Sequence, residues 1–167
     1  NDSYKILPYL DPEVIKENSK IFCGYSDVMN LHLYCHRLGL STFYGPNLLT
    51  TVAEAGGWHS YSKYWFQRMF FQEETIGEIL PSADWSFDAH EHTNPQYTRK
   101  YIINKGYERV QGKGVVRGRL FGGHGGLMEY EEDSLISLTQ ADFTNKILFF
   151  EDIPEFCDVE YMGKFFD

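Results

Sequence analysis

A serine at the junction of two expected elements is the strongest candidate for chemistry in this chain. Ser26 lies in the turn Gly24-Tyr25-Ser26-Asp27, which follows the apolar run Ile21–Cys23. The residues after the turn are apolar at helical spacing, at Val28, Leu31, Cys35 and Leu38. This pattern predicts a buried strand, a tight turn and a helix. Ser26 would then lie where unpaired N–H groups and the helix dipole favour negative charge, which suits a nucleophile.

A structural role for Ser26 is the alternative. Serine and aspartate directly before an apolar helix are common N-caps. In addition, Val28 occupies the position of the second glycine in the G-x-S-x-G nucleophile elbow. Spacing alone therefore favours an N-cap over a nucleophile.

A carboxylate in the second half of the chain is the next candidate. Glu151 follows the most apolar stretch of that half, Ile147–Phe150, which predicts a buried strand. The carboxylate should therefore emerge at the end of this strand. It is either an ordinary surface acid or the acid that orients a catalytic histidine, as in a triad.

Two clusters of glycine and histidine carry weaker signals. The run Gly122–Gly126, which contains His124, offers backbone N–H groups to an anion, but it lacks the spacing of a nucleotide-binding loop. We expect a tight turn near a ligand. His90-Glu91-His92 has metal-ligand types without a further placed ligand, so we expect a solvated loop and no metal.

The elements around Ser26 form an expected βαβ unit. Leu40–Tyr44 predicts a second strand, which Gly45-Pro46-Asn47 ends. Two strands joined through one helix imply a parallel sheet. Ligands bind at the carboxyl ends of the strands in such sheets, which is where Ser26 and Gly45-Pro46 both fall.

Helical patterns flank this unit. Two short helices are predicted over Tyr4–Asn18, the second with Asp11 as its cap and Pro12 at its first position. Trp58–Phe71 predicts an amphipathic helix, and its aromatic stripe is typical of a core.

The composition changes near Glu73, where we place a domain boundary. Gln72–Asp88 is polar, and after it helical periodicity gives way to shorter runs, including a strand pattern over Val115–Leu120. The sequence therefore predicts an α/β fold. A parallel-sheet portion of the Rossmann or flavodoxin type over residues 1–73 precedes a linker and part of a β-rich domain over residues 74–167.

The composition narrows the class of protein. With 167 residues, 43% of them hydrophobic and 17% aromatic, the chain has enough apolar material for one domain or two small ones. A formal charge of -9 argues against nucleic acid or an anionic membrane surface as the main partner. Three cysteines without a C-x-x-C pair indicate a reducing compartment. No apolar window is long enough for a membrane helix, and the polar start without Met indicates part of a longer protein.

The segment KIFCGYSDVMNLHLYCHRLGLSTFYGPNLL, from Lys20 to Leu49, resembles the hallmark segment of the LD-carboxypeptidase family of serine peptidases. Two further motifs match in the same order. They are a Gly-x-Leu strand ending in Gly-Gly, over Gly118–Gly123, and an I-L-F-x-E-D strand end, over Ile147–Asp152. The resemblance covers nearly the whole chain. The polar middle section is more similar to the microcin C immunity protein branch than to the murein-trimming members.

The resemblance implies a cytoplasmic hydrolase that needs no metal or cofactor. Ser26 matches the nucleophile, the Asp27 N–H an oxyanion-hole donor and Glu151 the triad acid. It also implies substrate contacts at Tyr25, Gly45, Pro46, Gly122, Gly123 and His124. The implied substrate is a small peptide or peptidyl-nucleotide, cleaved at an amide of murein-derived tetrapeptide or of a peptidyl- or aminoacyl-nucleotide.

Departures from the family pattern limit what this chain is expected to do alone. The triad histidine of the family lies downstream of the position of Asp167, and none of the six histidines present matches it. The family's Gly-Gly turn would precede Asn1. Tyr44 stands where histidine often precedes Gly-Pro, and His124-Gly125 replaces the usual Asn-Leu. We therefore expect a fragment that is inactive by itself, from a parent that is a serine hydrolase.

A binding module is the competing interpretation. An α/β domain of this kind could hold a small anion at the Ser26 helix terminus without chemistry. Trp58 and Trp85 are either stacking surfaces for a base or, as aromatic residues more often are, packing residues. Apolar surface left exposed by truncation predicts self-association, with a homodimer among the forms considered.

Overall fold

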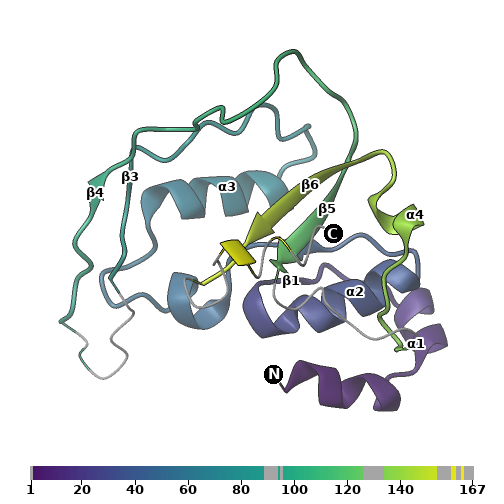
Figure 1. Cartoon of the computed structure of the whole chain (residues 1–167). Helices are drawn as coiled ribbons and strands as arrows, with labels where there is room; N and C mark the ends of the chain where they lie inside the picture. Colours follow the sequence, from purple (N-terminus) through teal and green to yellow (C-terminus); the bar gives the residue numbers. More distant parts are fainter. Residues whose placement is uncertain are drawn as a thin grey trace. The chain divides into compact units, whose positions relative to one another are not determined.

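The computed structural model of the chain describes residues 2–88, 94, 96–125, 134–153, 159–160 and 163 (Figure 1). The sequence-predicted loop His90-Glu91-His92 and the last glycine of the run, Gly126, lie outside the described residues. The chain divides into two compact units. The first consists of Asn1–Gly45 and Val115–Asp167, and the second of Pro46–Gly114.

The first unit begins with two short helices, as predicted. The 3-10 helix η1 spans Ser3–Tyr9 and the α-helix α1 spans Pro12–Glu17. The Asp11 carboxylate accepts hydrogen bonds from the N–H groups of Glu13 and Val14, at 2.9 and 3.2 Å. Asp11 as cap and proline at the first helical position are thus confirmed, because proline has no N–H to lose there.

The βαβ unit around Ser26 is also confirmed. Strand β1 (Cys23–Gly24) pairs in parallel with β2 (Phe43–Tyr44), and helices η2 (Ser26–Val28) and α2 (Met29–Arg37) connect them. The predicted buried strand over Ile21–Cys23 is wrong in its bounds. Ile21 is 65% exposed, since pairing with β2 begins only at Cys23.

Helix α2 buries other residues than the apolar positions from which it is predicted, although Leu31 and Leu38 pack against the core. Val28, Leu31, Cys35 and Leu38 are only partly buried. The residues that α2 buries include two polar ones and are Met29, Asn30, His32, Leu33 and Tyr34. The polar members are buried because each has hydrogen-bond partners in the unit, described below, and a paired polar group costs little to bury.

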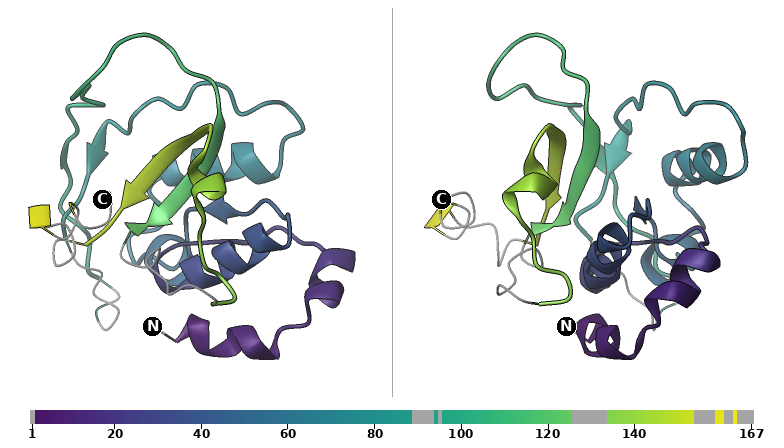
Figure 2. Two further views of the ribbon diagram at one scale, coloured as in Figure 1. Left: turned by 45° about the vertical axis from the view of Figure 1, so that its right-hand side comes forward. Right: turned by 90° about the vertical axis from the view of Figure 1, so that its right-hand side faces the viewer.

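A second parallel pair completes the first unit. Strand β5 (Arg119–His124) pairs with β6 (Lys146–Glu151) in a register that runs from Arg119 opposite Lys146 to His124 opposite Glu151. The two arrows lie side by side in Figures 1 and 2. Helix α4 (Gln140–Phe143) precedes β6. The strand predicted over Ile147–Phe150, with Glu151 at its end, is confirmed.

Two predictions for the glycine-rich region are wrong. The strand predicted over Val115–Leu120 begins only at Arg119, and Val115 is fully exposed. Gly122 and Gly123 lie inside β5 instead of in a tight turn, with φ angles of 148° and 145°. A Cβ atom on Gly122 would overlap the carbonyl group of Phe149. Only glycine therefore lets β5 approach β6 this closely.

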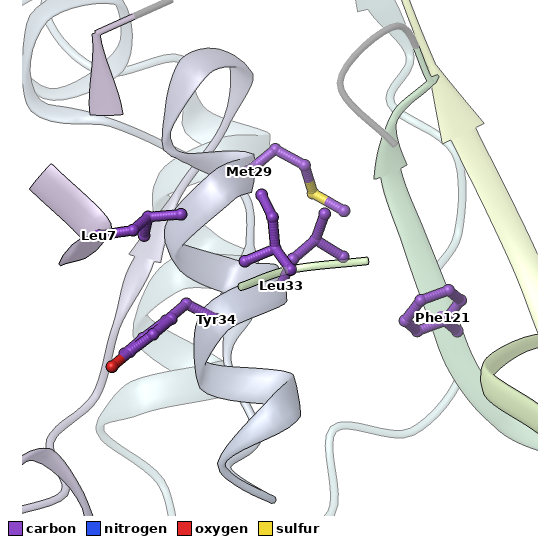
Figure 3. Packing of buried hydrophobic residues seen from close by; sticks show 6 residues of the cluster. Leu7, Met29, Leu33, Tyr34 and Phe121 are labelled. Carbon is purple, nitrogen blue, oxygen red and sulfur yellow. The ribbon is translucent and has the colours of Figure 1, made fainter. Parts of the chain in front are cut away.

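The core of the first unit joins its N-terminal helices to β5. Figure 3 shows Met29 and Leu33 on α2, with Leu7 of η1 on one side of that helix and Phe121 of β5 on the other. Among the described residues, six apolar ones are buried in this core, namely Leu7, Met29, Leu33, Tyr34, Phe121 and Ile136. Helix η2 also lies against β5. The core thus brings the carboxyl end of β5 to the Ser26 turn.

The second unit contains a π-helical turn η3 (Leu48–Val52), helix α3 (Ser60–Phe70) and an antiparallel pair, β3 (Asp84–Trp85) with β4 (Ile102–Ile103). The helix predicted over Trp58–Phe71 is confirmed as α3. The core role predicted for its aromatic stripe is wrong, because no residue of α3 is fully buried and its rings pack on one another. Every helix in the described part of the chain is too short or too polar to cross a bilayer. The domain boundary near Glu73 stays a prediction.

Candidate active site

Ser26 lies at a sharp strand-to-helix turn. Its φ angle is 65°, in the left-handed region that non-glycine residues rarely occupy. Ser26 is also exposed. The N-cap interpretation does not describe it, since Tyr25 precedes η2 and Val28 precedes α2. A strained, exposed serine between a strand and a helix has the geometry of a nucleophile elbow.

Gly24 makes this turn sterically possible. A Cβ atom at this position would lie 2.9 Å from Cγ2 of Val28. Gly24 occupies the position of the elbow's first glycine, and its missing side chain leaves room for the valine that stands in place of the second.

Tyr44 joins Ser26 to Glu151. The Ser26 N–H donates a hydrogen bond to the Tyr44 hydroxyl oxygen at 3.0 Å, and the Tyr44 O–H donates to Oε1 of Glu151. Burial, followed by the hydrogen bond to Glu151, raises the pKa of Tyr44 above its ordinary value. The hydroxyl therefore stays protonated and donates throughout the physiological range.

His32 fixes the strand that leads into the turn. Its Nε2 lies 3.0 Å from the Gly24 carbonyl oxygen and its Nδ1 lies 2.8 Å from the Thr42 hydroxyl. Since the carbonyl can only accept, Nε2 carries the proton and Nδ1 accepts from the hydroxyl. Burial lowers the pKa of His32, which favours this neutral form.

Asp27 holds the start of the chain against the turn. Its Oδ2 accepts from the N–H groups of Asp2 and Ser3, at 3.2 and 2.9 Å. Its carbonyl oxygen accepts from the Ser3 hydroxyl and from Nδ2 of the fully buried Asn30. The side chain of Asp27 is thus structural, while the oxyanion role predicted for its N–H stays a prediction.

His124 ends β5 beside the same turn. Its Nδ1 lies 3.0 Å from Oδ1 of Asp152, and both side chains are buried. Gly123 precedes it, and a Cβ atom there would lie 2.6 Å from Sδ of Met29 and 3.0 Å from the Tyr44 ring. Met29 directly follows η2, so this packing brings the end of β5 close to Ser26.

Most of the sequence-predicted site residues therefore share the first unit. The half-buried Tyr25 precedes Ser26, and the N–H of Gly45 donates to the Gly24 carbonyl oxygen at 3.0 Å. Glu151 lies opposite His124, while Gly122 and Gly123 lie opposite the two residues that precede Glu151. Pro46 begins the second unit. Within the described residues, no group of three or more His, Cys, Asp and Glu is placed to hold a metal ion.

Sequence reasoning missed three residues of this arrangement. They are Tyr44, His32 and Asp152. Tyr44 and Asp152 are each next to a predicted site residue in the sequence. Tyr44 directly precedes Gly45 at a strand end, and Asp152 directly follows Glu151. His32 left a weaker signal, a lone histidine in the first turn of a helix, because its partners Gly24 and Thr42 become neighbours only in the fold.

The N-terminal domain model of the LD-carboxypeptidase family matches residues 1–45. YocD of Bacillus subtilis, provisionally named a carboxypeptidase, is 34% identical over 124 residues, which are 74% of this chain and 36% of that protein. This chain belongs to the LD-carboxypeptidase family. The microcin C7 self-immunity protein MccF of Escherichia coli is another relative, 29% identical over 127 residues, 74% of this chain and 37% of MccF.

Solved structures from the same family share the fold. An MccF-like protein of Streptococcus pneumoniae, solved in complex with AMP, aligns with a TM-score of 0.79 at 26% identity over 99% of this chain and 54% of that one. An MccF-like protein of Bacillus anthracis aligns with a TM-score of 0.77 at 27% identity, over 98% of this chain and 48% of that one. The predicted α/β class with parallel strands is confirmed. The chain spans about a third of the length of the curated relatives it matches.

Proposed function

We propose that this chain supplies the nucleophile and the acid of a serine hydrolase of the LD-carboxypeptidase type. The observation that carries the proposal is the exposed Ser26 at a φ angle of 65°, linked through the Tyr44 hydroxyl to Glu151. Strain of this kind costs about 1 to 3 kcal/mol and persists mainly at functional sites. A serine that served only as a helix cap would not need it.

In the proposed reaction, Ser26 Oγ attacks the carbonyl carbon of an amide as a histidine takes the hydroxyl proton. Backbone N–H groups, that of Asp27 among them, stabilise the resulting oxyanion. The carbon–nitrogen bond breaks as the histidine returns the proton to the leaving amine, which gives an acyl-enzyme. Water then hydrolyses the ester and restores Ser26.

The histidine of this triad is proposed to lie outside the 167 residues. His124 is not a substitute, because its Nδ1 faces Asp152 and not Glu151. A triad acid must hold the imidazole by a direct hydrogen bond to orient it. The chain alone is therefore proposed to be inactive.

The substrate class is proposed as an amide in murein-derived tetrapeptide or in a peptidyl- or aminoacyl-nucleotide. One curated relative is provisionally named a murein peptide carboxypeptidase, and MccF has been solved with glutamyl sulfamoyl guanosine. Trp85, in the second unit, is 43% exposed, and its ring centroid lies 4.1 Å from that of Phe87, so stacking of Trp85 on a base stays a prediction.

Labelling of Ser26 with a serine-directed fluorophosphonate tests the proposal. The chain itself and a version extended at both ends to the length of its relatives are compared, with Ser26→Ala as the control in each. We expect labelling of the extended protein only, abolished by Ser26→Ala. If neither version labels while a reference hydrolase does, the enzyme proposal fails and a module that binds a small anion becomes the better description.

A further inference from the structure

We infer that Tyr44 is a positioning residue that couples the Glu151 carboxylate to the Ser26 backbone. The inference rests on the proposed function, in which both residues take part in catalysis. Its basis is a continuous pair of hydrogen bonds, from the Ser26 N–H to the Tyr44 hydroxyl and from that hydroxyl to Glu151. Ser26 and Glu151 have no direct bond in this arrangement, so the hydroxyl is the physical link between them.

The ring of Tyr44 is held in place by three elements of the first unit. Its centroid lies 5.7 Å from that of His32 on α2 and 5.9 Å from that of Phe149 on β6. On a further side lies Gly123 of β5, where even a Cβ atom would come within 3.0 Å of the ring. Because the ring is packed on these sides, its hydroxyl has little freedom to leave the position between Ser26 and Glu151.

The direction of the two bonds follows from the chemistry of the groups. A backbone N–H can only donate, and an ionised carboxylate can only accept. The Tyr44 hydroxyl therefore accepts a hydrogen bond from the Ser26 N–H and donates its one proton in a hydrogen bond to Glu151. Burial and this bond raise the pKa of Tyr44, so the proton stays on the hydroxyl at every pH at which the enzyme would work.

This arrangement assigns Tyr44 two effects on the proposed reaction. It restrains the Ser26 amide, and with it the strained φ angle that presents the hydroxyl of Ser26. It also occupies Oε1 of Glu151, which leaves Oε2 as the oxygen for an incoming imidazole. Tyr44 touches no reacting atom, so it acts only through the residues that do.

The first test measures the link itself in this chain by NMR. The amide proton of Ser26 is compared in the wild type, Tyr44→Phe, Glu151→Gln and the double variant. We expect each single change to shift this resonance, and Glu151→Gln to have no further effect once the Tyr44 hydroxyl is removed. The inference is overturned if Tyr44→Phe leaves the Ser26 amide unchanged, or if Glu151→Gln shifts it equally with and without the hydroxyl.

Tyr34→Phe is the matched control. Tyr34 is another tyrosine of the first unit and is buried, but its hydroxyl donates to the Leu10 carbonyl oxygen at 3.4 Å. Removal of the Tyr34 hydroxyl should leave the Ser26 amide proton resonance at its wild-type chemical shift. If Tyr44→Phe does not fold, as judged by thermal melting, Glu151→Gln still removes the charge that strengthens the bond from the Tyr44 hydroxyl. A Ser26 amide resonance unchanged by Glu151→Gln then overturns the inference.

The second test measures the fluorophosphonate labelling rate in the extended protein. We expect Tyr44→Phe to slow labelling of Ser26 by about tenfold or more, as small misplacements of reacting groups do, and Tyr34→Phe to leave it within about twofold. Equal rates in wild type and Tyr44→Phe would overturn the catalytic part of the inference. If the wild type itself does not label, the proposed function fails, and the NMR comparison alone then decides whether the Tyr44 link exists.

Discussion

At the scale of single residues, Gly123 shows how the site depends on the absence of a side chain. A Cβ atom there would lie 2.6 Å from Met29 Sδ and 3.0 Å from the Tyr44 ring. Either neighbour would have to move, and Tyr44 carries the hydroxyl that contacts both Ser26 and Glu151. Gly123 therefore helps to set the position of the Tyr44 hydroxyl, although it makes no hydrogen bond to that hydroxyl itself.

We expect Gly123→Ala to lower the free energy of unfolding more than Gly112→Ala does, by the overpacking cost of about 1 to 3 kcal/mol. Gly112 is the matched control because it also has a positive φ, of 75°, but nothing lies within 4 Å of its added Cβ. Urea denaturation of both variants measures the difference. Equal losses would mean that the contacts with Met29 and Tyr44 carry no cost.

His32 should make the chain less stable in mild acid. Burial lowers its pKa below the ordinary 6.5, so below that pH the unfolded chain binds a proton that the folded chain does not. Stability is therefore complete above about pH 6.5 and falls as the pH drops towards the folded pKa. We expect the melting temperature to decrease between pH 7.5 and 5.5, and His32→Gln to show a smaller decrease. An identical decrease in both proteins would contradict this role.

At the scale of elements, Asp142 joins two helices. Its Oδ2 accepts from the Thr139 N–H and hydroxyl, at 2.8 and 2.9 Å, which caps α4. Its Oδ1 lies 2.8 Å from His36 Nε2, and Arg37 lies 3.3 Å from Oδ2. One buried carboxylate thus caps the start of α4 and binds the end of α2. The Ser26 turn lies at the other end of α2.

We expect Asp142→Ala to cost about 2 to 4 kcal/mol, the sum of a lost cap and lost charge-assisted bonds. Asp11→Ala removes an exposed cap that has no such partners, and should cost about 1 kcal/mol. Burial raises the pKa of Asp142, but the bonds from Thr139 and His36 and the charge of Arg37 outweigh it and leave the pKa below 3.8. Its contribution is present above that pH and is lost as the pH falls through the folded pKa.

Denaturation curves of the two aspartate variants at pH 7 and at pH 3 measure both effects. The wild type should lose more stability in acid than Asp142→Ala does, because the variant lacks the carboxylate that titrates. A cost for Asp142→Ala no larger than that for Asp11→Ala would show that the junction between α2 and α4 adds nothing to the cap.

At the scale of the whole molecule, the chain exposes apolar residues beside an open strand pair. Val115 and Val116 precede β5 and are exposed, and Leu120 within β5 is 70% exposed. Parallel sheets are normally covered on both faces, and uncovered strands favour association. We expect this chain to self-associate despite its formal charge of -9.

Light scattering coupled to size-exclusion chromatography measures that association. A mass above 19.5 kDa that falls with dilution is expected, and Leu120→Lys should reduce it by placing a charge on the exposed strand. Glu17→Lys, at an exposed position on α1, is the surface control. A monomer at all concentrations would contradict the prediction.

Local patterns by themselves determined the βαβ unit around Ser26, the Asp11-Pro12 helix start and the strand that ends at Glu151. Each depends on neighbours a few residues apart, and periodicity and capping record such neighbours directly. The order of the motifs also indicated the LD-carboxypeptidase family.

Only the tertiary structure decided how the site is joined. Tyr44 and Glu151 are 107 residues apart, and nothing local to either residue predicts their bond. Gly122 and Gly123 have the composition of a turn, but the close approach of β6 makes them part of a strand. The burial of His32 on α2 likewise follows its partners outside the helix, Gly24 and Thr42, because contact with other elements outweighs the helix's own apolar pattern.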